Sequence, residues 1–230
     1  MHLHMVGVSH KTADVDVREA IAIAPAQQEQ ACRQLRTYEG IRGAVVLSTC
    51  NRTEIYVDVD DDSSAHDLVC AFIGDFKQVD RSVFEQHLFE REGIQVVHHL
   101  FSVVSSLDSM VLGEQQIIGQ TRNAFKNSVQ AGSCSMILER LFRQALSCGK
   151  RVRKETGISE SHVSLSTVAI DVARSEFDTF DDKQVLVVGS GEMSELSARY
   201  LRDLGVHSFV VISRTFSHAR ALAEHLGGSA

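Results

Sequence analysis

A cysteine in a polar turn is the first residue that could do chemistry. The stretch VVLSTCNRTEIYV, residues 45–57, places Cys50 between two runs of strand character, among hydroxyls, an amide and the guanidinium of Arg52. A free cysteine is usually buried as a small hydrophobe. Beside a positive charge it more readily forms the nucleophilic thiolate. Cys50 is therefore a candidate nucleophile, with a core cysteine as the alternative.

A glycine-rich turn is the second candidate site. In QVLVVGSGEMSELSARYLRDLG, residues 184–205, an apolar strand is followed by Gly189, Gly191 and an amphipathic helix, with Ser194 at the third glycine position. Dinucleotide-binding folds use this order because glycines let the backbone approach a pyrophosphate at the positive end of the helix. The pattern predicts dinucleotide binding rather than a plain tight turn.

The end of the next strand indicates which dinucleotide binds. A carboxylate there would hold a ribose 2′-hydroxyl, whereas the strand SFVVISRT, residues 208–215, ends in groups that suit a 2′-phosphate. The sequence therefore predicts NADP rather than NAD. The predicted cofactor-binding residues are Gly189, Ser190, Gly191, Glu192, Met193, Ser194, Ser213, Arg214 and Thr215.

A polar stripe is the third candidate. The apolar periodicity predicts one long helix over residues 107–130, and spacings of four, three and four place small and polar side chains along one face of it. That face either meets solvent or lines a pocket for a polar ligand. The stripe consists of Ser109, Gly113, Gln116 and Gln120, flanked by Glu114 and Gln115.

Composition narrows the class of protein. The 230 residues are 43% apolar and 23% charged, with no apolar run near the roughly 18 residues of a membrane span. The N-terminus has no secretory signal layout, so a cytoplasmic location is expected. Five cysteines without a C-x-x-C pair, and histidines that are scattered apart from His98 and His99, predict neither a disulfide framework nor a metal site.

Charge is unevenly distributed along the chain. Residues 119–156 contain eight basic and two acidic residues, a net charge of +6, which leaves −13 on the remainder of a chain of net charge −7. A basic helical segment is either a solvated face or a track for phosphates.

The order of elements predicts an α/β protein of two domains. We expect an N-terminal α/β domain that ends in a long connector helix, residues 1–156, and a Rossmann-type unit, residues 157–230. Because only two strands of the nucleotide unit fit before the last residue, the chain is expected to be truncated. The expected strands are 3–9, 44–48 and 54–59, and the expected helices are 24–38, 65–76, 94–104, 135–156 and 168–177.

Together these residues resemble the glutamyl-tRNA reductase family, over nearly the whole chain and in the family's order. Ser106 departs from the family pattern, which generally has glycine there, as do Asp14, Gln115 and Ser213. The matching stretches are GVSHKTADVDVREAIA, VVLSTCNRTEIY, HLFSVVSSLDSMVLGEQQIIGQ, LFRQALSCGKRVRKETGI, SLSTVAIDVA and VLVVGSGEMSELSARYL.

The resemblance implies a reaction and its residues. Cys50 would be the nucleophile, His99 would assist the chemistry, and residues 189–194 would hold the pyrophosphate of NADPH. Glutamyl-tRNA(Glu) would be reduced through a thioester to glutamate 1-semialdehyde, the first step of tetrapyrrole (haem) biosynthesis. The residues implied to hold the glutamyl group are Thr49, Asn51, Arg52, Ser109, Glu114, Gln115, Gln116 and Gln120.

The resemblance also implies partners and leaves alternatives. The aminomutase that consumes glutamate 1-semialdehyde is a candidate partner, no membrane is expected, and family members dimerise through a C-terminal helical domain that this chain lacks. With a partial nucleotide unit, the chain is expected to form the thioester and lose it to water. One alternative is a non-catalytic tRNA-binding or regulatory relative, and another is an NADP-dependent dehydrogenase of a free metabolite.

Overall fold

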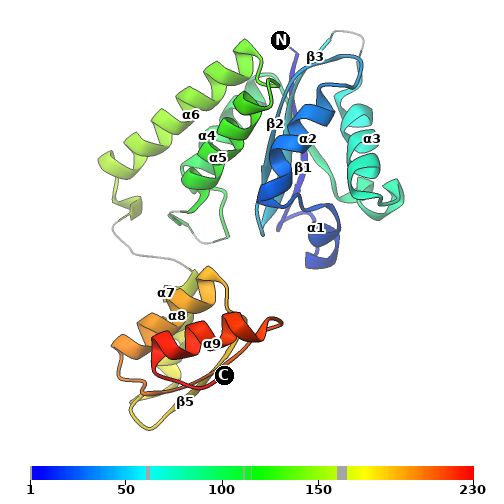
Figure 1. Cartoon of the computed structure of the whole chain (residues 1–230). Coiled ribbons are helices and arrows are strands. Elements are labelled where there is room, and N and C mark those ends of the chain that lie inside the picture. The colour runs from blue at the N-terminus through cyan, green and yellow to red at the C-terminus, as the bar shows by residue number, and fades with distance from the viewer. Residues whose placement is uncertain (1, 61–62, 111, 115, 160–164) are drawn as a thin grey trace. The chain divides into compact units, whose positions relative to one another are not determined.

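The chain forms two compact units, residues 1–159 and 160–230. The computed structural model describes residues 2–60, 63–110, 112–114, 116–159 and 165–230 (Figure 1). Each unit mixes helices and strands, which confirms the predicted α/β class. No helix within these described ranges is long and apolar enough to cross a membrane.

The first unit is built on an antiparallel sheet of four strands in the order β2-β3-β1-β4. Its strands are β1 (Leu3–Ser9), β2 (Ile41–Ser48), β3 (Arg52–Val59) and β4 (Phe89–Glu92). Its helices are α1 (Val15–Ile21), α2 (Gln28–Leu35), α3 (Ala65–Lys77), α4 (Ile94–Val104), α5 (Gln116–Gln130) and α6 (Met136–Glu155). Short 3₁₀ turns lie at η1 (Pro25–Gln27), η2 (Arg81–Val83), η3 (Glu85–His87) and η4 (Gly157–Ser159).

Two hydrophobic cores lie on the two faces of this sheet. Successive strand side chains point to opposite faces, so Ile55 and Val57 of β3 join the core with α1, α2 and α3, while Tyr56 joins the core with α4, α5 and α6. Helices therefore cover both faces of the sheet (Figure 1). β3 is buried along its whole length, so its polar residues must find partners inside the protein.

The second unit has the predicted strand–helix–strand–helix order. Its elements are α7 (Leu165–Glu176), β5 (Gln184–Val188), α8 (Glu192–Asp203), β6 (Ser208–Ile212) and α9 (Phe216–Leu226). β5 and β6 pair in parallel, which a crossover helix such as α8 permits. Val187, Phe209 and Val211 form a small core with the apolar sides of α8 and α9.

Most predicted elements agree with the structure, and one is wrong. The predicted helices 65–76, 94–104 and 135–156 correspond to α3, α4 and α6, whereas α1 was not expected. The predicted helix 107–130 does not exist as one element, because α4 ends at Val104 and α5 begins at Gln116.

Left-handed backbone explains the break between α4 and α5. Ser106 and Gly113 have φ angles of 59° and 84°, which an α-helix cannot contain. A Cβ on Gly113 would lie 2.4 Å from the backbone oxygen of Ile158, so the close approach also requires glycine. Ser109 and Gly113 therefore lie in a connecting segment and share no helix face with Gln116 and Gln120.

Two helical glycines provide a test of packing between the helices. A Cβ on Gly149 of α6 would lie 2.6 Å from Val104 Cγ1 and 2.9 Å from the Val104 backbone oxygen, whereas a Cβ on Gly119 of α5 would meet nothing within 4 Å. We expect Gly149→Ala to lower the free energy of unfolding by about 1–3 kcal/mol through overpacking. Gly119→Ala should raise it by roughly 0.5–1 kcal/mol through helix propensity. Urea denaturation of both variants measures the difference, and equal effects would contradict the close approach of α6 to α4.

Candidate active site

A hydrogen-bonded turn between β2 and β3 presents Cys50 to solvent. The Thr49 N–H donates to the Arg52 carbonyl over 2.8 Å, and the Thr49 hydroxyl oxygen accepts from the N–H groups of Asn51 and Arg52, each over 3.2 Å. These bonds hold the backbone of the turn in one shape. Cys50 is exposed, whereas Cys32 is buried. The structure thus favours an accessible thiol over a core cysteine at this position.

The residue after β1, His10, supports the same turn. The His10 N–H donates to the Asn51 carbonyl over 2.9 Å. The His10 Nδ1 atom is buried and has no hydrogen-bond partner among the described residues. Burial, together with the positive charges of Arg52 and Lys11, lowers the pKa of His10. These effects favour the neutral form of the His10 imidazole.

Arg52, the first residue of β3, is almost completely buried. Its side chain is 2% exposed, and its Nη1 atom lies 2.6 Å from Glu54 Oε1 and 3.2 Å from Asp108 Oδ2. Its Nη2 atom donates to the Asp108 carbonyl. Burial opposes the charge, but Glu54 outweighs it and raises the pKa of Arg52. The guanidinium that follows Cys50 is therefore held by protein groups.

Glu54 joins this arginine to His99. The Glu54 side chain is fully buried, its Oε1 lies 2.9 Å from His99 Nε2, and its Oε2 accepts from the Tyr56 hydroxyl over 2.6 Å. Burial alone would raise the pKa of Glu54, but the hydrogen bond from His99 and the charge of Arg52 lower it. Burial and the adjacent carboxylate raise the pKa of Tyr56 well above its usual value. Glu54 is therefore ionised and accepts hydrogen bonds from three sides.

The segment between α4 and α5 contributes Asp108. Its carboxylate pairs with Lys11 and with Arg52. Burial opposes ionisation of Asp108, and the hydrogen bond from Lys11 and the charge of Arg52 together lower its pKa. This segment is also tied at its ends, because the Ser106 hydroxyl donates to the Glu114 carbonyl over 2.6 Å. Ser106 thus keeps a side chain in left-handed backbone and uses it to close the segment.

The remaining predicted glutamyl-binding residues are placed in different ways. Ser109 is half-buried, and its hydroxyl oxygen is buried without a partner among the described residues. The Glu114 carbonyl accepts from Arg153 Nη2 over 2.5 Å. Gln116 is exposed at the start of α5, and Gln120 is half-buried one turn later. Gln115 lies outside the described residues.

Sequence reasoning did not select four members of this network: Lys11, Glu54, Tyr56 and Asp108. One signal was available, because Arg52, Glu54 and Tyr56 alternate along β3 and so share a face of the sheet. A charged pair on a strand buried on both faces requires internal partners. Asp108 carried no comparable local signal, since it lies 56 residues from Arg52 in the chain.

The second unit places the predicted cofactor-binding residues after β5, in the first turn of α8 and after β6. Gly189 follows β5 with a φ angle of 98°, and its N–H donates to the Ile212 carbonyl over 2.7 Å. The hydroxyls of Ser190 and Ser213 lie 3.0 Å apart, so the glycine turn and the end of β6 are adjacent. Arg214 and Thr215 follow, and Thr215 is the N-cap residue of α9.

The glycine turn has the features that a pyrophosphate requires. Gly191 is the N-cap residue of α8, and the N-terminus of a helix is the end whose dipole attracts an anion. A Cβ on Gly191 would meet nothing within 4 Å, so space exists in front of the backbone. A dinucleotide phosphate therefore fits the residues at this turn.

Comparison with known proteins agrees with both units. The family model for "Glutamyl-tRNAGlu reductase, N-terminal domain" matches residues 6–156, and that for "Shikimate / quinate 5-dehydrogenase" matches residues 171–230. The glutamyl-tRNA reductases of Geobacter metallireducens and Geobacter sulfurreducens are each 41% identical to the chain, over 99% and 100% of its residues. The solved glutamyl-tRNA reductase from Methanopyrus kandleri matches 99% of the chain with 36% identity and a TM-score of 0.65.

The glycine turn and its parallel strands define a Rossmann-type nucleotide-binding class of unit, attached to a domain with an exposed cysteine. The chain belongs to the glutamyl-tRNA reductase family. It spans about half the length of the curated relatives it matches, 52% and 53% of the two Geobacter proteins.

The buried carboxylate makes stability depend on pH in a known direction. Because the pKa of Glu54 is lowered in the folded state, its stabilising effect is complete above the unfolded value of about 4.3 and is lost as the pH falls through the folded value. We expect Glu54→Gln to lower the free energy of unfolding at pH 7 by about 3–5 kcal/mol, since Arg52 keeps a buried charge. Below pH 5, the free energy of unfolding of the variant should also fall less steeply with pH than that of the wild type. The difference in slope should correspond to about one titrating proton.

Denaturant titrations at several pH values measure both effects. Glu29→Gln is the matched control, because that carboxylate is exposed in an i,i+4 pair and should change stability by less than about 1 kcal/mol. Tyr56→Phe removes only one hydrogen bond to Glu54 and should cost about 1–2 kcal/mol. An unchanged pH profile in Glu54→Gln would contradict the lowered pKa.

Proposed function

We propose that this chain carries the chemistry of NADPH-dependent reduction of glutamyl-tRNA to glutamate 1-semialdehyde, with Cys50 as the nucleophile. The observation that supports it is an exposed thiol on a rigid turn, directly before a buried Arg52–Glu54–His99 network. Nucleophilic catalysis requires an accessible, positioned thiol with an acid or base near it.

The first step is acyl transfer to Cys50. The thiolate sulfur attacks the carbonyl carbon of the aminoacyl ester, a C–S bond forms, and the C–O bond to the tRNA 3′-oxygen breaks. The departing oxygen takes up a proton. An ester is already activated, so no ATP is needed.

His99 is proposed as the proton donor or acceptor of this reaction. Its side chain is 10% exposed, and its Nε2 atom is held by Glu54. An imidazole oriented by a buried carboxylate is the usual arrangement of a general acid or base near neutral pH. Glu54 acts through His99 and is a positioning residue.

Arg52 is proposed to bind a carboxylate of the glutamyl group by exchanging one partner. Its contact with the buried Glu54 is 2.6 Å, while its contact with the 21% exposed Asp108 is 3.2 Å. Asp108 is therefore the partner that an incoming carboxylate replaces, and it retains Lys11 as a counterion.

The second unit is proposed to bind NADPH, which when bound supplies the hydride that converts the thioester to the aldehyde. The turn from Gly189 to Ser194 would hold the pyrophosphate at the N-terminus of α8. Arg214, after β6, would pair with the 2′-phosphate.

tRNA binding is proposed to use the exposed basic residues of α6. Arg140, Lys150 and Lys154 are exposed on this helix, whereas Arg143 and Arg151 are paired with Glu139 and Glu155 one turn away. Exposed cations of one sign suit the phosphate backbone of RNA.

Replacement of the cysteine tests the nucleophile. Cys50→Ser should abolish transfer of labelled glutamate from glutamyl-tRNA to the protein, because an alcohol is far less ionised than a thiol. Its free energy of unfolding should change by less than about 0.5 kcal/mol, since the side chain is exposed. Cys148→Ser, at a half-buried position on α6, should retain acyl transfer. Acyl label on Cys50→Ser protein would refute the assignment, and absence of label on the wild type would favour the non-catalytic alternative.

Charge removal on α6 tests the tRNA surface. Changing Arg140, Lys150 and Lys154 to glutamine should weaken tRNA binding and reduce the magnitude of the log–log salt slope by about 0.7–0.9 for each lost phosphate contact. Filter binding at a series of salt concentrations measures the slope. The same change at Arg33 and Arg220, exposed residues paired with glutamates elsewhere, is the control. An unchanged slope would mean that α6 makes no phosphate contact.

A further inference from the structure

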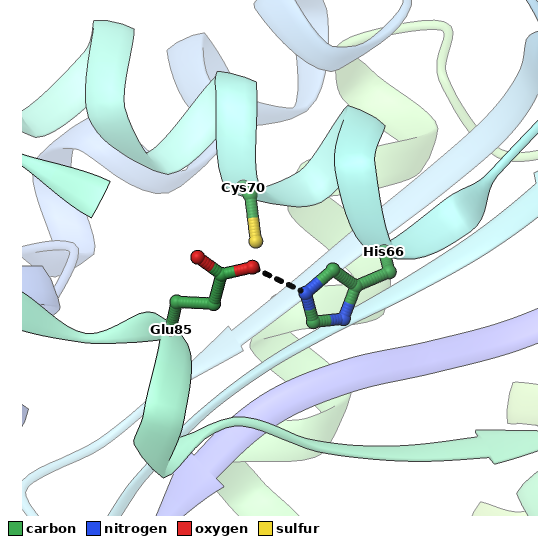
Figure 2. Close-up of side chains that lie close together, drawn as sticks. All are labelled: His66, Cys70 and Glu85. Carbon is green, nitrogen blue, oxygen red and sulfur yellow. Dashed lines mark hydrogen bonds and ion pairs between the residues drawn. The ribbon is translucent and has the colours of Figure 1, made fainter. Parts of the chain in front are cut away.

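A second cluster of reactive side chains lies on α3, outside the residues discussed so far. His66 and Cys70 are four residues apart on this helix and therefore share a face. Glu85 of the 3₁₀ turn η3 approaches the same face (Figure 2). One ligand atom from each of the three residues lies within 4.8 Å of the others. Imidazole, thiol and carboxylate are the three side-chain groups that bind zinc in proteins.

The separations are close to those of a tetrahedral site. Bond lengths of about 2.0–2.3 Å place neighbouring ligand atoms roughly 3.3–3.6 Å apart around zinc. His66 Nε2 and Glu85 Oε1 already lie 3.3 Å apart. Cys70 lies within the 4.8 Å limit, so a side-chain movement of about 1 Å closes the set.

Glu90 of β4 orients the histidine for this purpose. His66 Nδ1 is hydrogen-bonded to Glu90 Oε1. A carboxylate accepts, so Nδ1 carries a hydrogen toward Glu90, and Nε2, which is hydrogen-bonded to Glu85 Oε1 over 3.3 Å, is the nitrogen on which an ion beside Glu85 would replace a proton. A carboxylate behind the metal-binding histidine is the usual outer partner at zinc sites.

Arg81 is the group that opposes a cation here. Its Nη2 atom lies 2.6 Å from Glu85 Oε1 and 2.8 Å from Asp67 Oδ1. A metal ion would share or replace the contact with Glu85, while Asp67 would still neutralise the arginine. Arg81 therefore lowers the affinity of the site for a cation but does not prevent a cation from binding.

We propose that His66, Cys70 and Glu85 bind a divalent zinc ion, with Glu90 holding His66 in place. The Cys70 thiol gives its proton to solvent as the Zn–S bond forms, and a water molecule completes the tetrahedron. Thiolate and imidazole ligands select zinc over magnesium or calcium. The half-buried His66 also lines a pocket of about 380 Å³ together with its partner Glu90.

Titration of the metal-free chain with Zn²⁺ and Co²⁺ tests the proposal. We expect one Zn²⁺ per chain by calorimetry, a higher Tm with zinc, and a thiolate-to-cobalt charge-transfer band in the Co²⁺ form. Cys70→Ser should lose the band, and Cys148→Ser should retain it. Glu85→Gln, a change at a half-buried position, should weaken Zn²⁺ binding at least tenfold without unfolding the chain.

Arg81→Gln gives a variant with the opposite expected sign. Removing the competing guanidinium should tighten Zn²⁺ binding severalfold, an effect that general loss of structure cannot produce. Absence of a thiolate band in the wild type would overturn the proposal. So would a band that persists in Cys70→Ser, or Zn²⁺ affinity that is unchanged in both Glu85→Gln and Arg81→Gln.

Discussion

The ion pair between Arg52 and Glu54 constrains the rest of the first unit. Both side chains lie on the α4–α6 face of β3, at 2% and 0% exposure. Removing two charges from water costs several kcal/mol for each ion, and their attraction offsets this only when further hydrogen bonds satisfy the remaining atoms. Asp108, His99 and Tyr56 supply those bonds. The segment after α4 and the middle of α4 must therefore meet at one end of β3.

This constraint gives the cysteine turn its rigidity. Arg52 is the fourth and last residue of the turn's hydrogen-bonded ring as well as a member of the buried network, since its N–H and carbonyl both bond to Thr49. A reactive group placed directly on such an anchor loses little freedom when a substrate binds. Lys11 and Arg52 are balanced by Asp108 and Glu54, so under the proposed function a negatively charged substrate group would enter by exchange with Asp108 rather than by adding uncompensated charge.

Local patterns predicted the elements but not the network. Apolar repeats of 3.6 residues located α3, α4 and α6, and the glycine turn between a strand and a helix located the β5–α8 junction. Contacts between distant residues have no such periodic signal: Glu54 and His99 are 45 residues apart, and Arg52 and Asp108 are 56 apart. The predicted helix over 107–130 was wrong because the spacing of apolar residues does not show where the backbone takes a positive φ angle. Gly113 was visible in the sequence, and the signal for left-handed backbone at Ser106 was the glycine that the resembling family generally has at this position.

The metal cluster and the cysteine site are joined through β4. This strand has four residues, pairs only with β1 among the described strands, and is mostly exposed. In the segment before it, residues 78–88, Phe84 is fully buried, and Val79 and Leu88 pack partly buried against the same core. Phe89 of β4 packs edge-on against His99, with ring centroids 5.5 Å apart, and Glu90 is its neighbour. An ion bound by His66 and Glu85 would connect this segment to α3. Through Glu90 and its neighbour Phe89, the ion would also restrict the position of His99, the histidine that is hydrogen-bonded to Glu54.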